Sequence, residues 1–251
     1  MIAQDYVDSL DELKPLLDLI TKGSLNRQSL VKAGFDPDLL SPAIAGSVVL
    51  LVSRFERFLK DIANGALSHF GKAAPAISRS QLPHGLQVQI ISKNIGAAVQ
   101  RTRYGQTRTA VDRISSVDRI ANRIVADDIW GDDAIDTYSN PNSETVRSIL
   151  SLLGVAKPWE AVETEFATVW TAQRGLDNSL KSIPSASAEL ESVLVWRNTA
   201  AHTGRGLLIG PHEVKETLAF LECLGLAIDE ALKNSVEAQI VGLKAKPGAW
   251  S

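Results

Sequence analysis

The chain has little cysteine, no large excess of either charge and no long apolar run, and each shortage excludes a class of protein. Cys223 is the only cysteine among 251 residues, which excludes an intrachain disulfide framework and a cysteine-rich zinc site. The net charge of −3 excludes a generally basic nucleic-acid-binding surface, although a local basic patch remains open. The longest apolar run, between Pro42 and Val52, is far shorter than the roughly 18 residues of a membrane span. We therefore expect a cytoplasmic protein that does not contact a membrane.

Period-two alternation and internal repeats are also lacking, whereas apolar residues recur at helical spacing through most of the chain. Ser41 followed by Pro42 is a typical helix start, and a long apolar stripe follows. These patterns predict an all-α fold of seven to nine helices. We expect residues 1–40 to form an N-terminal helical extension, residues 41–240 to form the main helical domain and residues 241–251 to form a flexible tail. The main helices are expected over 3–21, 41–70, 86–99, 145–153, 158–173, 186–203 and 211–234.

The helix expected over 186–203 changes character along its length. Its apolar stripe begins with Leu190, Val193 and Leu194. At the same spacing of three and four positions the stripe then becomes polar. Burying an unpaired arginine is too costly for that change to be accidental packing, so this face either meets a partner or lines a site. The residues in the second half of the stripe are Arg197, Asn198, Ala201 and His202.

Arginine and histidine without a carboxylate cluster suit phosphodiester chemistry that needs no metal. RNA supplies its own nucleophile, the 2′-hydroxyl. His202 would move the proton and Arg197 would offset the charge on the phosphate. Only one histidine lies in the segment, whereas cleavage needs both a base and an acid. A twofold dimer would supply a second His202, which is a physical reason to expect a homodimer with a composite active site.

Three segments, in this order, resemble those of HEPN domains. Arg197-Asn198-Thr199-Ala200-Ala201-His202 resembles the R-x4–6-H signature of that superfamily. Residues 50–61 resemble the first core helix of the RiboL-PSP and MAE-type groups, whose acidic residue is matched by Glu56. Residues 140–155 resemble a segment that those groups carry before the signature helix.

The resemblance implies a dimeric HEPN-type helical bundle with additional N-terminal helices. It also implies a metal-independent endoribonuclease of a toxin–antitoxin or antiphage defence system, with an antitoxin or defence protein as a further partner. Arg197 would stabilise the phosphate, His202 would be the acid or base, and Asn198 would orient the histidine or the phosphate. Glu56 would hold Arg197, or else form a surface ion pair with Arg57 or Lys60. The alternative function is a non-catalytic helical module that binds RNA or a protein.

The remaining candidates concern substrate binding and metals. Arg205, in the glycine-rich stretch after His202, is a candidate substrate-binding residue. Residues 101–123 contain six arginines and two aspartates, which indicates either a solvated face or a phosphate-binding ridge. His69 and His84 lack the spacing of a metal site, so we expect no metal and no cofactor.

Overall fold

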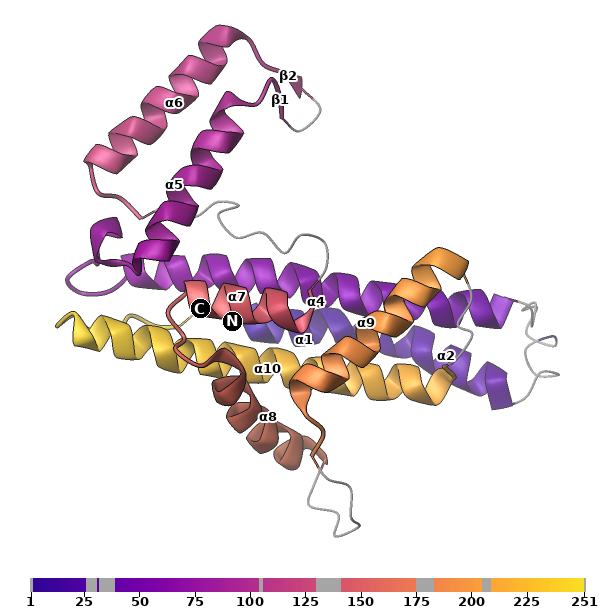
Figure 1. The fold of residues 1–251 in the computed structure, drawn as a ribbon. Helices are drawn as coiled ribbons and strands as arrows, with labels where there is room; N and C mark the ends of the chain where they lie inside the picture. Colours follow the sequence, from indigo (N-terminus) through magenta and orange to yellow (C-terminus); the bar gives the residue numbers. More distant parts are fainter. Residues whose placement is uncertain are drawn as a thin grey trace. The chain divides into compact units, whose positions relative to one another are not determined.

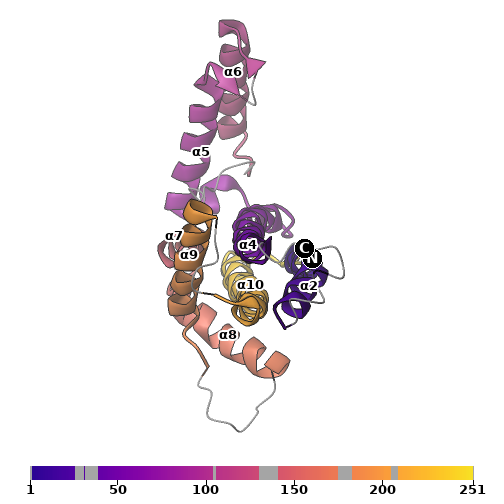
Figure 2. The same cartoon turned by 90° about the vertical axis from the view of Figure 1, so that its right-hand side faces the viewer.

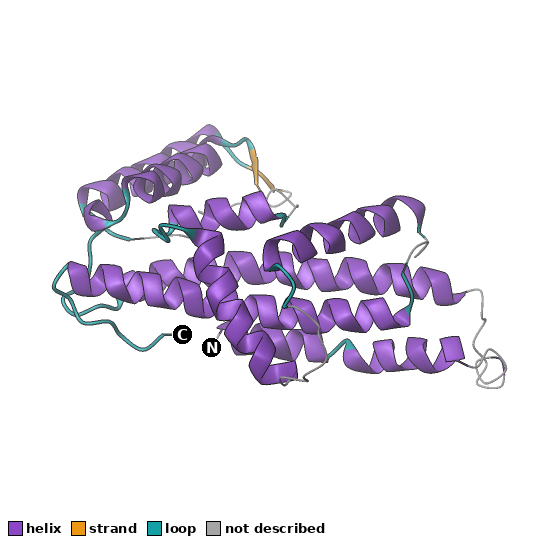
Figure 3. Ribbon diagram, turned by 60° about the horizontal axis from the view of Figure 1, so that its bottom comes forward, coloured by secondary structure: helices purple, strands orange, loops and turns teal. Residues whose placement is uncertain are grey.

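The structure, a computed structural model, describes residues 2–25, 31, 39–103, 106–129, 141–174, 183–204 and 209–250. Apart from one pair of two-residue strands, the regular secondary structure in these ranges is helical (Figure 3), which confirms the predicted all-α class. The elements are α1 (Ile2–Asp11), α2 (Lys14–Leu25), α4 (Leu40–Gly71), the 3-10 helix η2 (Arg79–Gln81), α5 (His84–Val99), β1 (Thr102–Arg103), β2 (Gln106–Thr107), α6 (Ala110–Val125), α7 (Ser143–Leu152), α8 (Pro158–Arg174), α9 (Ala186–Thr203) and α10 (Pro211–Gly242).

The chain divides into two compact units. The first comprises residues 1–59, 138–147 and 157–231, and the second comprises the remaining residues. In the first unit, α4 and α10 lie next to each other, with α2 on one side and α9 on the opposite side (Figure 2). Large side chains that are fully buried fill this unit, among them Leu10, Leu51, Phe55, Phe58, Phe166 and Phe220.

Tyr6 holds α1 in the core of the first unit. Its ring stacks on Phe58 of α4 with 4.4 Å between the ring centroids, and its hydroxyl donates to the carbonyl oxygen of Leu221 at 3.1 Å. Burial raises the pKa of Tyr6 well above its usual value. The ring passes so close to Gly225 of α10 that any Cβ there would collide with it, which explains a glycine inside this helix. Helix α1, which the sequence assigned to an N-terminal extension, therefore packs into the core of the first unit.

Two helix boundaries differ from the sequence-based expectation. The helix predicted over 3–21 is two helices, because α1 ends at Asp11 and α2 begins at Lys14. Pro15 lies in the first turn of α2, where its missing N–H removes no helical hydrogen bond. The last helix extends past residue 234 to Gly242, since Val236 and Ile240 continue its fully buried face.

In the second unit, α5 and α6 run side by side in opposite directions and are joined through β1 and β2 (Figure 1). At the far end of this hairpin, Arg108 connects the two helices. Its guanidinium donates to the carbonyl oxygens of Ala97 and Ala98 at 3.1 and 3.0 Å, and to that of Asp112 at 3.1 Å. It also donates to the Ser116 hydroxyl. Arg108 thus satisfies carbonyl groups at the C-terminus of α5 that have no partner within the helix.

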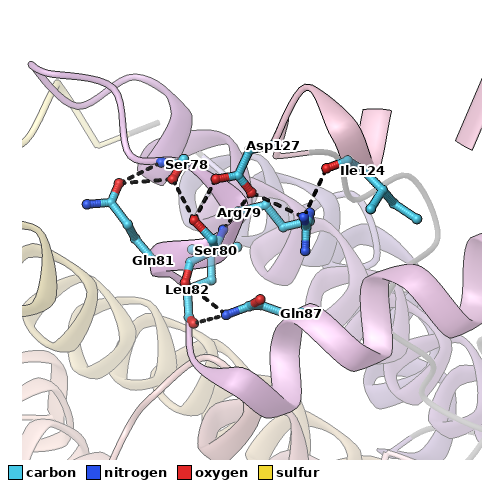
Figure 4. A network of polar contacts seen from close by, with 8 residues as sticks. All are labelled: Ser78, Arg79, Ser80, Gln81, Leu82, Gln87, Ile124 and Asp127. Carbon is cyan, nitrogen blue, oxygen red and sulfur yellow. Dashed lines mark hydrogen bonds and ion pairs between the residues drawn. The ribbon is translucent and has the colours of Figure 1, made fainter. Parts of the chain in front are cut away.

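A polar network closes the other end of the hairpin (Figure 4). Asp127, just after α6, accepts hydrogen bonds from the backbone N–H and the hydroxyl of Ser80 at 2.9 and 2.5 Å, and it pairs with Arg79 at 3.2 Å. Arg79 is buried and also donates to the carbonyl oxygen of Ile124 at 3.2 Å. The Ser80 hydrogen bonds are the main reason that the pKa of Asp127 lies below its ordinary value. The segment before α5 is therefore anchored to the end of α6.

The C-terminal residues make specific contacts in the second unit, where the sequence suggested a flexible tail over 241–251. Lys246 and Ala74 exchange two backbone hydrogen bonds of 3.0 and 2.9 Å. Trp250 meets the buried ring of His69 edge-on at 4.8 Å between centroids. Burial lowers the pKa of His69. In the described ranges, no helix is both long enough and apolar enough to cross a bilayer.

Candidate functional site

The helix that carries the Arg-Asn-x-x-x-His segment, α9, is fixed at both ends. Glu163 of α8 accepts hydrogen bonds from the backbone N–H groups of Ala186 and Ser187 at 3.0 and 3.2 Å. This carboxylate satisfies donors that a helix start leaves unpaired, and its charge suits the positive end of the helix dipole. At the other end, Gly204 adopts a left-handed φ of +63° and its N–H donates to the carbonyl oxygen of Ala200 at 2.8 Å. The helix therefore begins and ends where the sequence predicted.

The buried face of α9 turns away from His202. Leu190, Val193, Leu194 and Ala200 are buried. Arg197 lies on the same line and is half-buried, whereas Asn198, Ala201 and His202 are exposed. After Leu194, a helical spacing of three or four residues is compatible with two lines of side chains, one through residues 197 and 200 and the other through residues 198, 201 and 202. In the structure the first line faces the protein interior and the second faces solvent. The expectation that all four positions continue the inward stripe thus holds for Arg197 only.

Arg197 and Asn198 form a hydrogen-bonded pair at the edge of the buried face. The Nη1 atom of Arg197 donates to the Oδ1 atom of Asn198 at 3.0 Å. Among the described residues, this amide is the guanidinium's hydrogen-bond partner, and the buried Nε atom of Arg197 has none. A half-buried guanidinium with a buried Nε atom that meets a neutral amide but no carboxylate among the described residues lacks compensation for part of its lost hydration.

Asn198 connects the buried and exposed faces. Because Asn198 and His202 are four residues apart in a helix, their side chains lie about 40° apart around the axis, whereas Arg197 and His202 are about 140° apart. The guanidinium therefore approaches the histidine's side of the helix through its contact with Asn198. The sequence placed all three residues in one site, and the structure joins Arg197 to Asn198 directly.

Sequence reasoning missed two members of the exposed face. Glu191 and Val195 share a line with Asn198 and His202, with steps of four, three and four residues. Val195 is 62% exposed. The Glu191 carboxylate accepts from the Ser143 backbone N–H at 2.9 Å and from its hydroxyl at 2.5 Å, which anchors the start of α7 to α9. The helical spacing of Glu191, Val195, Asn198 and His202 is the sequence signal that identifies this face.

Glu56 and Arg205 are not joined to this group. Glu56 is half-buried on α4 and has polar contacts, but the contacts of Arg197 within the described ranges do not include its carboxylate. Arg205 lies outside the described residues. Trp196, next to Arg197 on α9, is half-buried.

Cys223 is buried. Its thiol donates to the Oε1 atom of Gln173 at 3.0 Å, and burial raises its pKa to about 12. A thiol with that pKa is not a nucleophile near neutral pH. In the described part of the chain, no three His, Cys, Asp or Glu side chains form a group that could hold a metal ion.

The fold and the site together define an all-α domain that carries an arginine–asparagine pair and a histidine at the end of one helix. The family model described as RiboL-PSP-HEPN matches residues 4–234, so the chain belongs to the RiboL-PSP group of the HEPN superfamily. The match includes α1 and α2, in agreement with their packing in the first unit. No curated protein and no solved structure matches the chain. Membership of this superfamily points to a function related to RNA.

Proposed function

We propose that this chain is a metal-independent endoribonuclease whose active site is shared between two copies. The observation that supports the proposal is the half-buried guanidinium of Arg197, which meets the Asn198 amide but no carboxylate among the described residues. A phosphate would provide the negative charge that this guanidinium lacks. RNA brings that phosphate close to a 2′-hydroxyl, and His202 is an exposed imidazole one helical turn beyond Asn198.

The reaction follows from the roles of these groups. The imidazole of one His202 removes the proton of the 2′-hydroxyl, and the 2′-oxygen forms a bond to phosphorus. The bond from phosphorus to the 5′-oxygen breaks, and the leaving oxygen takes a proton from the imidazolium of the other copy's His202. Arg197 stabilises the negative charge on the phosphorane oxygens, and Asn198 keeps the guanidinium oriented. The products are a 2′,3′-cyclic phosphate and a 5′-hydroxyl.

Val195 supports the shared site. Its exposed side chain lies on the same line as Asn198 and His202 and would be covered when a second copy meets this face. In an isologous dimer each copy offers the same patch, so both imidazoles approach a single cleft. The biological setting that we propose is a toxin–antitoxin or antiphage defence system acting in the cytoplasm.

The test compares two single histidine substitutions in the full chain. His202→Ala should lower cleavage of a fluorescent single-stranded RNA by about 100- to 10,000-fold, because it removes both the acid and the base. His212→Ala is the matched control, since His212 is an exposed histidine in the first turn of α10. Chelators should not change the rate, and the cleaved ends should carry cyclic phosphate.

Two outcomes contradict the proposal. Equal activity of the His202→Ala and His212→Ala variants would remove His202 from the reaction. RNA binding by the wild type without cleavage of any RNA would favour the non-catalytic module.

A further inference from the structure

A short segment after α10, residues 243–250, packs against the chain that leaves α4, and we name it the C-terminal strap. Lys246 of the strap exchanges two backbone hydrogen bonds of 3.0 and 2.9 Å with Ala74. Two residues further along, Gly248 passes so close to Lys72 that a Cβ atom at Gly248 would lie 3.2 Å from the Lys72 carbonyl oxygen. A step of two residues forward in the strap thus moves two residues back along its neighbour, so the strap runs antiparallel to the end of α4.

The strap begins with a turn that reverses the chain within two residues. Lys244 has a left-handed φ of +60°, which is uncommon for a residue with a Cβ atom. The N–H groups of Lys244 and Ala245 donate to the carbonyl oxygens of Val241 and Ile240 at 2.9 and 3.1 Å. These two bonds are the Schellman pattern of a helix end, and they satisfy carbonyl groups of the last turn of α10. The strap can therefore move about this turn without unwinding the helix.

The far end of the strap lies against His69, in the last turn of α4. The rings of Trp250 and His69 meet with 4.8 Å between their centroids and their planes 70° apart. The His69 side chain is fully buried, and among the described residues neither of its ring nitrogens has a hydrogen-bond partner of regular geometry. Burial of polar nitrogens in this way loses hydration without full compensation. The proposed cleavage does not use this titratable group, which lies where the strap meets α4.

The surroundings of His69 favour its neutral form. Burial is the largest influence on the pKa of His69 and lowers it from the ordinary value of 6.5. The carboxylate of Glu237 on α10 and the backbone of Ala249 in the strap raise this pKa, whereas the ammonium group of Lys72 lowers it. The strap's own lysines are exposed. If the strap moves away, water reaches the ring and the pKa returns toward 6.5, so the ring binds a proton more readily in the released state.

We propose that His69 is a proton-operated latch that holds the C-terminal strap in place at neutral pH and releases it on acidification. A proton on the ring would place a charge and a second N–H donor in a buried site whose nitrogens already lack regular hydrogen bonds. Below pH 6.5 the released state binds a proton that the docked state does not. The ratio of docked to released strap therefore falls by up to about tenfold for each pH unit until the lowered pKa is reached. The latch shares no residue with the candidate site on α9, so the two proposals stand or fall separately.

Hydrogen exchange of the full chain between about pH 8 and about pH 5 tests the latch. In the wild type, the protection factors of the Lys246 and Ala74 amides should fall as the pH drops below 6.5, after correction for the intrinsic exchange rate. The Arg79 amide, which donates to the Asp127 carbonyl oxygen at 3.0 Å in the same unit, should keep its protection because the release is local. Fluorine NMR of protein labelled with fluorotryptophan, assigned with Trp250→Phe, should show the Trp250 signal changing over the same pH range.

Substitutions at and around the ring separate the latch from simple packing. His69→Phe and His69→Leu cannot titrate, so the protection of the strap amides should not depend on pH in either variant, whatever its level. Glu237→Gln should move the fall in protection to lower pH, and Lys72→Met should move it to higher pH. Both residues lie outside the strap, so their charges act on the ring in the docked and released states alike. His84→Asn is the matched control, since His84 is an exposed histidine at the start of α5, and it should retain the wild-type profile.

Three outcomes would overturn the inference. The first is constant protection of the strap amides in the wild type across the whole pH range. The second is a fall in protection that persists in both His69→Phe and His69→Leu. The third is a parallel loss of protection at the Arg79 amide, which would mean that acid loosens the whole unit and not the strap.

Discussion

The C-terminal half of α9 and the α5–α6 hairpin depart from ordinary helix patterning in opposite ways. In α9 a charged residue, Arg197, lies on the buried line, where an apolar side chain would be more stable. In α6 the apolar residues Val111 and Ile114 are exposed, where polar side chains would be more soluble. Neither departure improves the folding of the isolated chain. The phosphate of an RNA substrate is the molecule that we propose to account for the departure in α9.

Arg197→Met is expected to have the largest effect and separates function from stability at one position. Cleavage should fall by about 100- to 1,000-fold, because the group that stabilises charge on the phosphate is removed. The melting temperature should stay unchanged or rise, since methionine has a similar length and buries no uncompensated charge. Parallel cleavage assays and calorimetry measure both effects. A marked loss of stability would show that the guanidinium stabilises the fold, which would contradict its proposed role in binding phosphate.

Leu190→Ala and Val195→Ala compare the buried and exposed lines of α9. Leu190 is fully buried, so its truncation should lower the free energy of unfolding by about 2–5 kcal/mol. Val195 is mostly exposed, and its truncation should change that free energy by less than about 0.5 kcal/mol. Urea unfolding of both variants provides the numbers. If Val195→Ala leaves the monomer stable but weakens dimerisation, the exposed line is the interface that the shared site requires.

The sequence predicted helices better than it predicted their surroundings. The bounds of α9 agree because Ser185, Gly204 and the apolar stripe are local signals. The turn at the end of the hairpin was missed because β1 and β2 have two residues each, too few for a period-two pattern. The contact between Lys246 and Ala74 joins residues far apart in the chain, so no local pattern indicates it. For that reason the sequence predicted a flexible tail.

The candidate site was only partly predictable for a similar reason. The types and spacing of Arg197, Asn198 and His202 were sufficient to select the helix, whereas the chemistry assigned to them stays a prediction. Which of two helical lines would be buried depends on the packing of α9 in the first unit, and no local pattern encodes that choice. The role of Glu163 as the cap of α9 also comes from a different helix, so the sequence of α9 does not reveal it.

Asp127→Asn should produce the smallest effect and tests whether the hairpin is held as a unit. The Ser80 hydrogen bonds, followed by smaller contributions that include Arg79, hold the pKa of Asp127 below its ordinary value of 3.8. A carboxyl group whose pKa is lower in the folded state stabilises that state at pH values above 3.8, and this contribution disappears as the pH falls through the lowered pKa.

The wild type should therefore show faster amide exchange at the base of the hairpin as the pH falls below 3.8, after correction for the intrinsic exchange rate. Asp127→Asn should show that faster exchange already at neutral pH and little further change on acidification. Asp118→Asn, on the exposed flank of α6, is the control and should retain the wild-type profile. An unchanged profile in Asp127→Asn would show that the backbone hydrogen bond between Arg79 and Asp127, at 3.0 Å, is sufficient to close the hairpin.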